Sequence, residues 1–338
     1  MLRSCLAVFL TFSSLVFLSL APSSLAMAET LKPAVVYSVG GKFDQSFNEA
    51  AYRGLETFKE ETGTAYREFE ILNDAQSLQA VRSFARKDFS PVIAVGFNHA
   101  AAVTAAASEF PDTRFILIDA FVDAPNVQSV LFREHEGAYL VGILAQMASK
   151  TGKIGYVGGM DIPLIRKFEC GYRQGSYAAN PNGTVFANVA GTTVAAWTDP
   201  AKGAELARSQ MDRGADVILH GAGTTGLGVL QAAADAGKFG IGVDSNQNGL
   251  HPGFVLTSML KRVDVAVFDA LTALNKGDWQ PGARVLGLAE GGIGWALDDN
   301  NRSLITEQMQ VAVEKAERDI VSGIIKVHDS TRDGACPL

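Results

Sequence analysis

Residues that hold metals or carry out catalysis are scarce in this sequence of 338 residues. The five histidines stand apart from one another, and no HExxH pair is present to bind zinc. A GxSxG segment for a nucleophilic serine is missing, as is the GxxxxGK(S/T) loop that cradles phosphates. These absences argue against a metal site, a serine hydrolase and a nucleotide hydrolase, and we expect no cofactor.

Cysteine is nearly as rare, with three residues in the chain. Cys5 lies in an apolar leader, while Cys170 and Cys336 are far apart in sequence and form no CxxC spacing. That pattern indicates neither a zinc site nor a disulfide framework. We expect Cys170 and Cys336 to be independent thiols, although an oxidising compartment would allow them to pair.

Basic residues are outnumbered by acidic ones, 29 against 36. Arg3 is the basic residue of the leader, so removal of the leader leaves 28 basic and 36 acidic side chains and a formal charge of −8. Proteins that bind nucleic acid carry the opposite balance, usually as a basic patch. The composition therefore predicts no nucleic-acid partner.

The leader predicts export. Arg3 precedes a mostly apolar run over residues 6–20, and Ala26-Met27-Ala28 is typical of a signal-peptidase site. We expect residues 1–28 to be removed and the mature chain to start at Glu29, the alternative being an uncleaved membrane anchor. No cysteine follows the apolar run where a lipoprotein would need one, so a soluble periplasmic protein without a lipobox is predicted.

Short apolar segments alternate with helix-period segments along the rest of the chain, which is typical of βαβ units and parallel sheets. Strands are expected at residues 34–39, 68–72, 92–95, 115–118, 127–132, 154–157, 184–189, 217–219, 241–243, 255–259 and 284–288. Helices are expected at residues 47–62, 78–86, 100–110, 137–149, 202–213, 227–236, 263–276 and 303–325. The pattern predicts an α/β protein of two doubly wound parallel-sheet lobes with a cleft between them. Residues 29–132 and 256–282 are assigned to one lobe, and residues 133–255 and 283–338 to the other.

The stretch from Ala34 to Gly54 combines an apolar strand, a Gly-Gly turn and the start of a helix. In an open α/β sheet, ligands bind beyond the carboxyl ends of the strands, where loops and helix starts present side chains. Phe47 would offer a ring face there, and Asn48 an amide that reads the edge of a heterocycle. The alternative is that Phe47 faces the core, because Tyr52 and Leu55 share its general helical spacing.

A glycine-rich turn favours a different function. The segment from Gly221 to Gly226 follows an apolar strand, opens a helix and has Asp244 about 20 residues further on, which matches the dinucleotide-binding fingerprint. Alone it would predict an exported oxidoreductase. Export and the place of the motif in the second lobe argue against this alternative, and glycines that admit a ligand to backbone N–H groups serve a ribose hydroxyl equally well.

Seven short motifs along the mature chain resemble one known family. They are DQSFN at 44–48, LIDA at 117–120, EGAYLVG at 136–142, TDPAKG at 198–203, GTTG at 223–226, IGVD at 241–244 and TSMLKR at 257–262. This set is similar to the basic membrane protein (BMP) family of periplasmic binding proteins, whose best-known members are purine-nucleoside receptors of ABC transporters. The resemblance implies a type I periplasmic binding fold with a multi-crossing hinge, which closes on its ligand without performing chemistry.

The resemblance also implies roles for single residues. Phe47 matches the ring that stacks on the base, and Asn48 and Asp119 match the polar pair that reads the purine edge. Gly223, Asp244 and Lys261 match the residues that bind the sugar; the last two are expected to face each other as a charge pair that clamps vicinal hydroxyls. From the residues alone, Asp119 is also suited to capping a helix or to forming a salt bridge at the rim of the site, and Asp244 and Lys261 to a purely structural ion pair.

Some positions depart from the family pattern. Some relatives carry an acidic residue where this chain has Ser38, and an aromatic residue near the strand that here ends in His220. We expect Trp197 to cover the second face of the base, with Phe97 and Phe168 as further rings. Asp44, the first residue of the DQSFN motif, completes the predicted site.

The expected ligand is a purine nucleoside or purine base, delivered by a monomeric receptor to an inner-membrane permease; a binding protein used for sensing is the alternative.

Overall fold

The first sheet has a centre of short strands whose sequences are continuous apolar runs, AVVY, VIAV and FILI. The computed structural model describes residues 31–337, and the predicted leader at residues 1–28 lies outside the described residues. The strands pair in the order β11-β5-β4-β3-β1-β2, all parallel. They are β1 (Ala34–Tyr37), β2 (Arg67–Glu70), β3 (Val92–Val95), β4 (Phe115–Ile118), β5 (Val127–Phe132) and β11 (Gly282–Leu286). Strands β1, β3 and β4 are buried at every position because helices cover both faces of the sheet.

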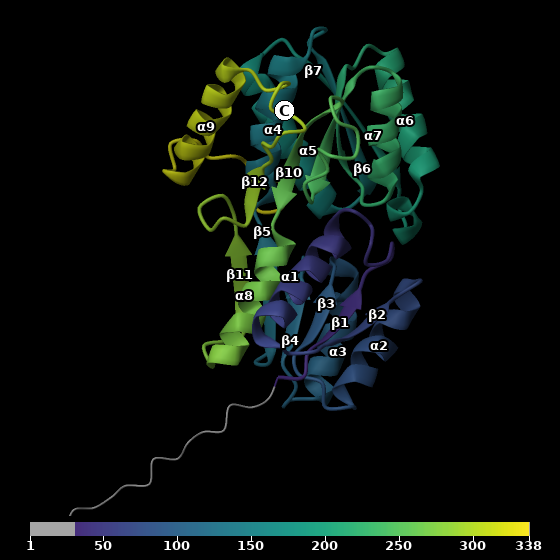
Figure 1. The fold of residues 1–338 in the computed structure, drawn as a ribbon, viewed down its shortest axis with the longest axis vertical. Coiled ribbons are helices and arrows are strands. Elements are labelled where there is room, and N and C mark those ends of the chain that lie inside the picture. Colours follow the sequence, from purple (N-terminus) through teal and green to yellow (C-terminus); the bar gives the residue numbers. More distant parts are fainter. Residues whose placement is uncertain (1–30, 338) are drawn as a thin grey trace, which may run out of the picture. The chain divides into compact units, whose positions relative to one another are not determined.

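The second sheet repeats this plan. Its strands pair in the order β12-β10-β9-β8-β6-β7, with β12 antiparallel to β10 and the others parallel. They are β6 (Lys153–Met160), β7 (Thr184–Gly191), β8 (Val217–Gly221), β9 (Phe239–Asp244), β10 (Val255–Lys261) and β12 (Ile293–Trp295). The predicted class, two doubly wound α/β lobes, is thus confirmed (Figure 1).

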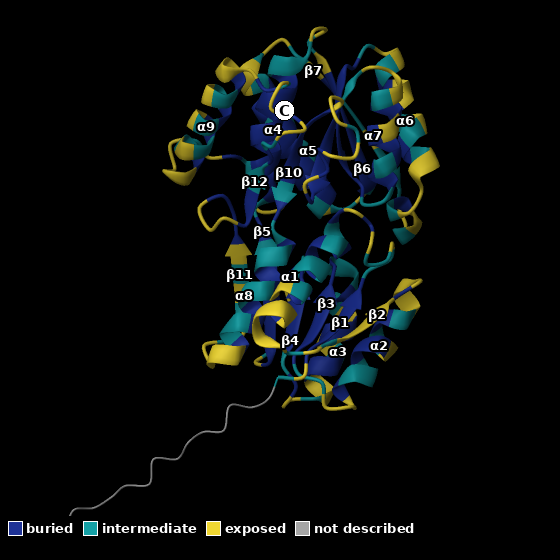
Figure 2. Cartoon of the chain, viewed as in Figure 1, coloured by how far each residue is buried: buried dark blue, intermediate teal, exposed yellow. Residues whose placement is uncertain are grey.

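Helices bury the faces of both sheets. The first lobe carries α1 (Phe47–Thr62), α2 (Ser77–Ala85), α3 (Ala100–Glu109), α8 (Val263–Lys276) and the short helices η1 (Asp74–Gln76) and η2 (Phe97–His99). The second carries α4 (Glu134–Ala148), α5 (Pro163–Ala179), α6 (Pro200–Asp212), α7 (Thr225–Asp235), α9 (Glu307–Val321) and the short helix η3 (Val194–Trp197). Helices α1 and α8 pack together opposite α2 and α3, and α4 and α5 pack together opposite α6 and α7. Figure 2 shows the strands between them as the buried centre of each lobe. None of the helices within residues 31–337 combines the length and apolar character needed to span a membrane.

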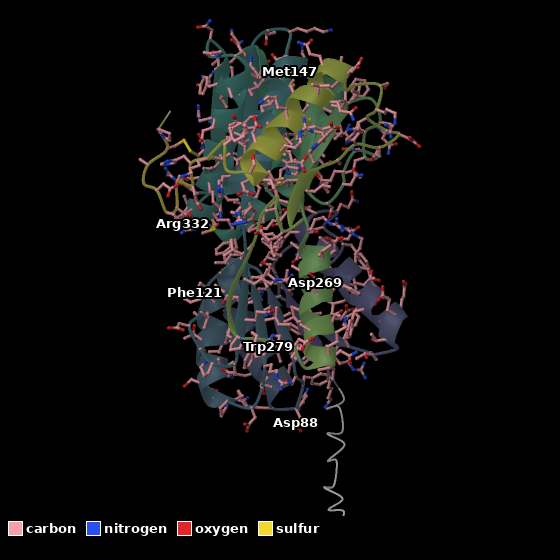
Figure 3. The ribbon with its side chains drawn as sticks, turned by 90° about the vertical axis from the view of Figure 1, so that its left-hand side faces the viewer. Asp88, Phe121, Met147, Asp269, Trp279 and Arg332 are labelled. Carbon is pink, nitrogen blue, oxygen red and sulfur yellow. A yellow bond between two sulfur atoms is a disulfide. The ribbon has the colours of Figure 1, made fainter. Side chains whose placement is uncertain are left out.

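The chain crosses between the lobes at places that differ in part from the prediction. The first crossing, after β5, lies at the expected boundary. However, β10 pairs with β9 in the second sheet, and β11 pairs with β5 in the first. The first lobe therefore receives α8 and β11 but not β10, so the predicted bounds of residues 256–282 begin and end too early. Asp269 of α8 pairs with Arg284 of β11 at 2.8 Å, in the lower body of Figure 3. An apolar strand pattern does not reveal which of two parallel sheets a strand joins.

The two cysteines of the described chain form a disulfide, so the expectation of independent thiols was wrong. Cys170 of α5 and Cys336 of the C-terminal segment have Cα atoms 5.7 Å apart. Gln174, one turn further along α5, donates to the His328 carbonyl at 3.1 Å and accepts from the His328 N–H at 2.8 Å. These contacts fasten the C-terminal segment along α5 and bring the cysteines together across 166 residues of sequence.

Candidate functional site

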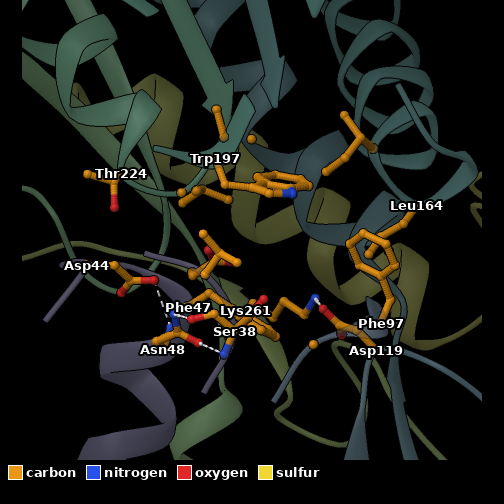
Figure 4. A pocket seen from close by; sticks show the side chains of 18 of the residues that line it. Ser38, Asp44, Phe47, Asn48, Phe97, Asp119, Leu164, Trp197, Thr224 and Lys261 are labelled. Carbon is orange, nitrogen blue, oxygen red and sulfur yellow. Dashed lines mark hydrogen bonds and ion pairs between the residues drawn. The ribbon is translucent and has the colours of Figure 1, made fainter. Parts of the chain in front are cut away.

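A cavity of about 80 Å³ lies where the carboxyl ends of strands from both sheets meet (Figure 4). That is several times the 10–15 Å³ or so that one water molecule requires. All ten residues predicted from the sequence line it: Ser38, Asp44, Phe47, Asn48, Phe97, Asp119, Trp197, Gly223, Asp244 and Lys261. Val39, Gly96, Leu164, Ile165, Phe168, Gly221, Ala222, Thr224 and Val243 complete the lining. Both lobes therefore contribute to one cavity at the place where folds of this type bind ligands.

Two aspartates at strand ends bring carboxylates to this cavity from opposite sheets. Asp119 directly follows β4 of the first lobe, and Asp244 ends β9 of the second. Both have left-handed backbone conformations, with φ of 72° and 63°. This conformation is uncommon outside glycine, and such residues cluster at functional sites. The local backbone thus turns both carboxylates out of their strands and into the cavity wall.

Lys261 is the cation of the cavity, and its partners differ from those predicted. Its side chain is 2% exposed, and its Nζ lies 2.6 Å from Asp119 Oδ2 and 3.0 Å from Glu134 Oε1. Asp244 instead accepts a hydrogen bond of 2.6 Å from the Ser46 hydroxyl. Asp244 and Lys261 therefore form no direct ion pair, so the alternative of a purely structural pair between them is wrong, while their expected clamp on ligand hydroxyls stays a prediction. The family resemblance placed both residues at the site, but Glu134, which lies behind the cavity wall, was missed.

Aromatic rings surround the Lys261 ammonium. Its Nζ lies 5.1 Å from the ring centre of Phe47, 5.0 Å from that of Phe132 and 5.9 Å from that of Phe168. These distances are within the range of cation–π attraction. Phe47 lines the cavity and also packs against the core cluster, so the two alternatives for this ring are combined in one side chain.

Trp197 lies across the cavity from Phe47 (Figure 4). It ends η3 of the second lobe and meets Phe97 of the first lobe edge to face, with ring centres 6.4 Å apart. A side chain at Gly159 would clash with the indole, because a Cβ there would lie 2.3 Å from its ring. The prediction that Trp197 and Phe97 reach the cavity is confirmed, and a flat ligand would lie between aromatic groups of both lobes.

The polar residues of the DQSFN segment largely serve the loop itself. The Asn48 amide donates to the Ser38 and Gly41 carbonyls and accepts from the Ser38 N–H, at 3.1–3.2 Å. Its donors are therefore used, and the expectation that Asn48 reads a purine edge with them was wrong in this conformation. Asp44 caps α1, accepting from the backbone N–H groups of Ser46, Asn48 and Glu49. The Ser38 hydroxyl donates to the Asn98 side chain at 3.0 Å.

Two oxygens at the cavity retain their hydrogen-bonding capacity. Asp119 Oδ1 and Thr224 Oγ1 are buried without a hydrogen-bond partner among the described residues. Buried polar groups in folded proteins are nearly always paired, so these two atoms are available to bind a ligand. Thr224 was missed because a single threonine after a glycine turn carries no distinctive pattern.

The pKa values of the three buried carboxylates, Glu134, Asp119 and Asp244, shift in different directions. Burial disfavours the charged form of Glu134, but Lys167 and Lys261 together outweigh it and lower its pKa to about 2. Asp119 shares the cation Lys261 with Glu134. Burial therefore outweighs the attraction of Lys261 and raises the pKa of Asp119. Burial likewise raises the pKa of Asp244 to about 6, although Lys261 and the Ser46 hydroxyl oppose the shift. Despite its own burial, Lys261 has a raised pKa because Asp119 and Glu134 favour its charged form.

Replacing Asp244 with asparagine should stabilise the ligand-free protein at neutral pH. The pKa of Asp244 is about 6 in the folded state and about 4 in an unfolded chain. Between these values the folded state holds a proton that the unfolded state has released, so the free energy of unfolding falls as the pH rises through this window. We expect Asp244→Asn to raise the free energy of unfolding by about 1–3 kcal/mol near pH 7.5 and to flatten its pH dependence between about pH 4 and 7.

Urea unfolding across this pH range measures the effect. Asp212→Asn, at an exposed position of α6, is the control and should leave both quantities unchanged. Equal pH profiles for wild type and Asp244→Asn would contradict the prediction.

Comparison with known proteins identifies the family. The chain matches ABC transporter substrate-binding proteins of the PnrA-like (Bmp) type over residues 32–331. It is 32% identical over 317 residues to the CD4+ T-cell-stimulating antigen of Listeria monocytogenes, covering 87% of each chain. It is 32% identical over 320 residues to the ABC transporter nucleoside-binding protein BmpA of Lactococcus lactis, covering 88% of this chain and 89% of that protein. A solute-binding protein of an ABC transporter system from Aeropyrum pernix has a similar structure, with a TM-score of 0.82, 29% identity, and coverage of 88% of this chain and 93% of its own.

These similarities confirm the resemblance to the basic membrane protein family and overturn the oxidoreductase alternative, because the family binds substrates without converting them. The glycine-rich turn has another use here: Gly221 and Gly223 line the cavity, and Gly226 packs against the His220 ring. Within residues 31–337 no group of three or more histidine, cysteine, aspartate or glutamate side chains is arranged to hold a metal ion. The chain therefore belongs to the PnrA-like family of ABC transporter substrate-binding proteins, with a type I periplasmic binding fold that takes up a small molecule for a transporter permease.

Proposed function

We propose that this protein binds a purine nucleoside or a purine base in the cavity between its lobes and delivers it to an inner-membrane permease. The observation that carries the proposal is the pairing of aromatic faces from both lobes, Phe47 and Trp197, with the charged residues Asp119, Asp244 and Lys261 around one cavity. A base needs flat apolar surfaces, and a ribose needs strong hydrogen-bonding partners. The name of the Lactococcus relative, a nucleoside-binding protein, supports the same ligand class.

Each group then has a task in binding. The base stacks on Phe47 under Trp197, and the free Asp119 Oδ1 accepts a hydrogen bond from a ring N–H or exocyclic amine. The ribose hydroxyls bind the Asp244 carboxylate and the Lys261 ammonium, with the Gly223 backbone close by. A free base has no ribose and would lack the contacts with Asp244 and Lys261, so we expect nucleosides to bind more tightly than bases.

Closure of the lobes brings these groups together. The Ser245 hydroxyl donates to the Ser46 carbonyl at 2.6 Å, and Arg53 of α1 donates to the same hydroxyl at 2.9 Å. Together with the bond from the Ser46 hydroxyl to Asp244, these contacts join the first lobe to the loop after β9 in the second. A ligand that touches both lobes favours this closed arrangement because its contacts are incomplete in an open one.

We further propose that the mature protein is a soluble periplasmic monomer. Three Pyrococcus relatives are named lipoproteins, whereas in this chain no cysteine stands directly after the apolar run at the position where a lipoprotein would need one. N-terminal sequencing of the exported protein tests this proposal, and a mature chain starting at Glu29 is the expected result.

Titration calorimetry with inosine, guanosine, adenosine, adenine and guanine tests the proposed ligand class. We expect at least one nucleoside to bind with a micromolar dissociation constant, or about −8 kcal/mol, and to raise the melting temperature by mass action. Free ribose is the control and should bind far more weakly because it cannot stack on Phe47. Absence of heat and of a thermal shift with every purine at millimolar concentration would overturn the proposal.

A further inference from the structure

Four charged side chains form a chain of alternating sign behind the cavity wall. Lys167 Nζ lies 2.5 Å from Glu134 Oε2, and Lys261 Nζ lies 3.0 Å from Glu134 Oε1 and 2.6 Å from Asp119 Oδ2. The order is therefore Lys167, Glu134, Lys261, Asp119. The last two line the cavity, whereas Glu134 and Lys167 do not.

The elements that carry these residues meet at the crossings between the lobes. Glu134 is the first residue of α4, directly after the first crossing, and Lys261 is the last residue of β10, directly before the second. Lys167 comes from α5 and also donates to the Phe132 carbonyl at 3.0 Å, on the near side of the first crossing. Asp119 belongs to the first lobe, so the charged chain connects the two lobes beside the cavity.

Burial makes this arrangement costly for stability alone. The Glu134 side chain is 1% exposed and that of Lys261 is 2% exposed. Removing such charges from water costs several kcal/mol per ion, and well-packed apolar residues often serve stability equally well. Glu134 has no contact with the cavity, so any contribution to binding passes through the Lys261 ammonium that it holds.

We infer that Glu134 is a positioning residue for ligand recognition, which holds the Lys261 ammonium against Asp119 and Phe47 so that its remaining hydrogen-bonding capacity faces the ligand hydroxyls. Lys167 contacts the other Glu134 oxygen. This contact holds the carboxylate in place and balances its charge. An ammonium carries three donors; Asp119 accepts a hydrogen bond from one of them, and Glu134 holds the group as an ion-pair partner. This inference rests on the proposed function in one respect, namely that Lys261 binds ribose hydroxyls.

The double variant Glu134→Gln/Lys167→Met tests the inference, because it removes one negative and one positive charge together. Lys261 keeps Asp119 as its partner but is no longer held from the other side. The probes are inosine and 2′,3′-dideoxyinosine, which share the base and differ in the ribose hydroxyls. In wild type, a charge-assisted contact to a hydroxyl should favour inosine by about tenfold or more. In the double variant we expect this preference to fall severalfold, to what the Asp244 carboxylate alone supplies, while the affinity for dideoxyinosine stays unchanged.

A merely structural role predicts a different result. Loosening of the whole cavity would weaken both nucleosides by the same factor and leave their ratio unchanged, and that outcome would overturn the inference. The control Lys202→Met/Glu205→Gln removes an ion pair on the surface of α6 and should alter neither affinity. If the double variant does not fold, Glu134→Asp provides the test, since it keeps the charge but withdraws the carboxylate from Lys261. It should likewise reduce the preference severalfold, and an undiminished preference there would overturn the inference.

The two proposals fail in distinguishable ways. Wild type that binds neither nucleoside nor any purine base would overturn the proposed function. Wild type that binds inosine and dideoxyinosine equally would leave the function standing and overturn the inference, because Lys261 would then have no hydroxyl to be positioned for.

Discussion

Replacing Lys261 with methionine should lower the free energy of unfolding by about 3–5 kcal/mol near pH 7.5 and abolish measurable nucleoside binding. The loss is large because Asp119 and Glu134 both lie within 3.0 Å of the Lys261 ammonium in a buried setting. Without it, Asp119 has no cation and Glu134 keeps only Lys167. Breaking a buried ion pair from one side leaves an uncompensated charge, which costs far more than an exposed pair contributes.

The deficit should shrink as the pH falls. Lys261 lowers the pKa values of Asp119 and Glu134 in the folded protein, so its removal raises both. Carboxyls with raised folded-state pKa values hold protons that the unfolded chain releases, and stability is then lost with rising pH. Urea unfolding at several pH values measures this. Lys315→Met, which breaks an exposed pair on α9, is the control and should cost less than about 1 kcal/mol. An equally small loss for Lys261→Met would show that the buried network is not coupled to folding.

Replacing Phe47 with alanine should weaken purine binding by about 1–3 kcal/mol, or roughly 5- to 150-fold in the dissociation constant. The ring lines the cavity and lies across it from Trp197, so its loss removes one face of the base-binding site. The fold should persist, because Phe47 is only partly buried and packs at the margin of the core.

Phe43→Ala is a matched control for this variant. Phe43 lies in the loop just before α1, which Phe47 begins, but its side chain is 64% exposed and does not line the cavity. Calorimetric titration should give wild-type affinity for Phe43→Ala and a clear loss for Phe47→Ala. Unchanged affinity in Phe47→Ala would place the base elsewhere.

The location of the site could be predicted from the sequence because the ends of apolar strands can be predicted from it. Apolar runs ending at Ile118 and Val243 are each followed by an aspartate, and carboxyl ends of parallel strands meet at one edge of a sheet. Together with the resemblance to the basic membrane protein family, that reasoning assigned Asp119 and Asp244 to the ligand site. It could not supply their partners, since the position of Lys261 between Asp119 and Glu134 depends on how two lobes pack.

Other errors have the same origin. The sequence does not show that the Asn48 amide already has partners. In the folded protein a tight loop brings the Ser38 and Gly41 carbonyls into hydrogen-bond contact with it. Helix α5 was not predicted, and it contains Gly171 and Gly175, which are poor helix formers. In the folded protein these glycines allow α5 to approach α4 closely; a Cβ at Gly175 would lie 1.9 Å from the Tyr139 carbonyl oxygen. Tertiary packing overrides helix propensity there.

The bond between Cys170 and Cys336 has a practical consequence for every comparison of variants. Glutathione and thioredoxin keep thiols reduced in the cytosol, whereas secretion exposes them to oxidants. Protein recovered from a cytosolic expression host would therefore mix two redox forms that differ in how the last residues are tethered to α5, and in conformational stability as well. Material routed through a secretory pathway, with free thiols titrated before use, gives a uniform reference for melting and affinity measurements.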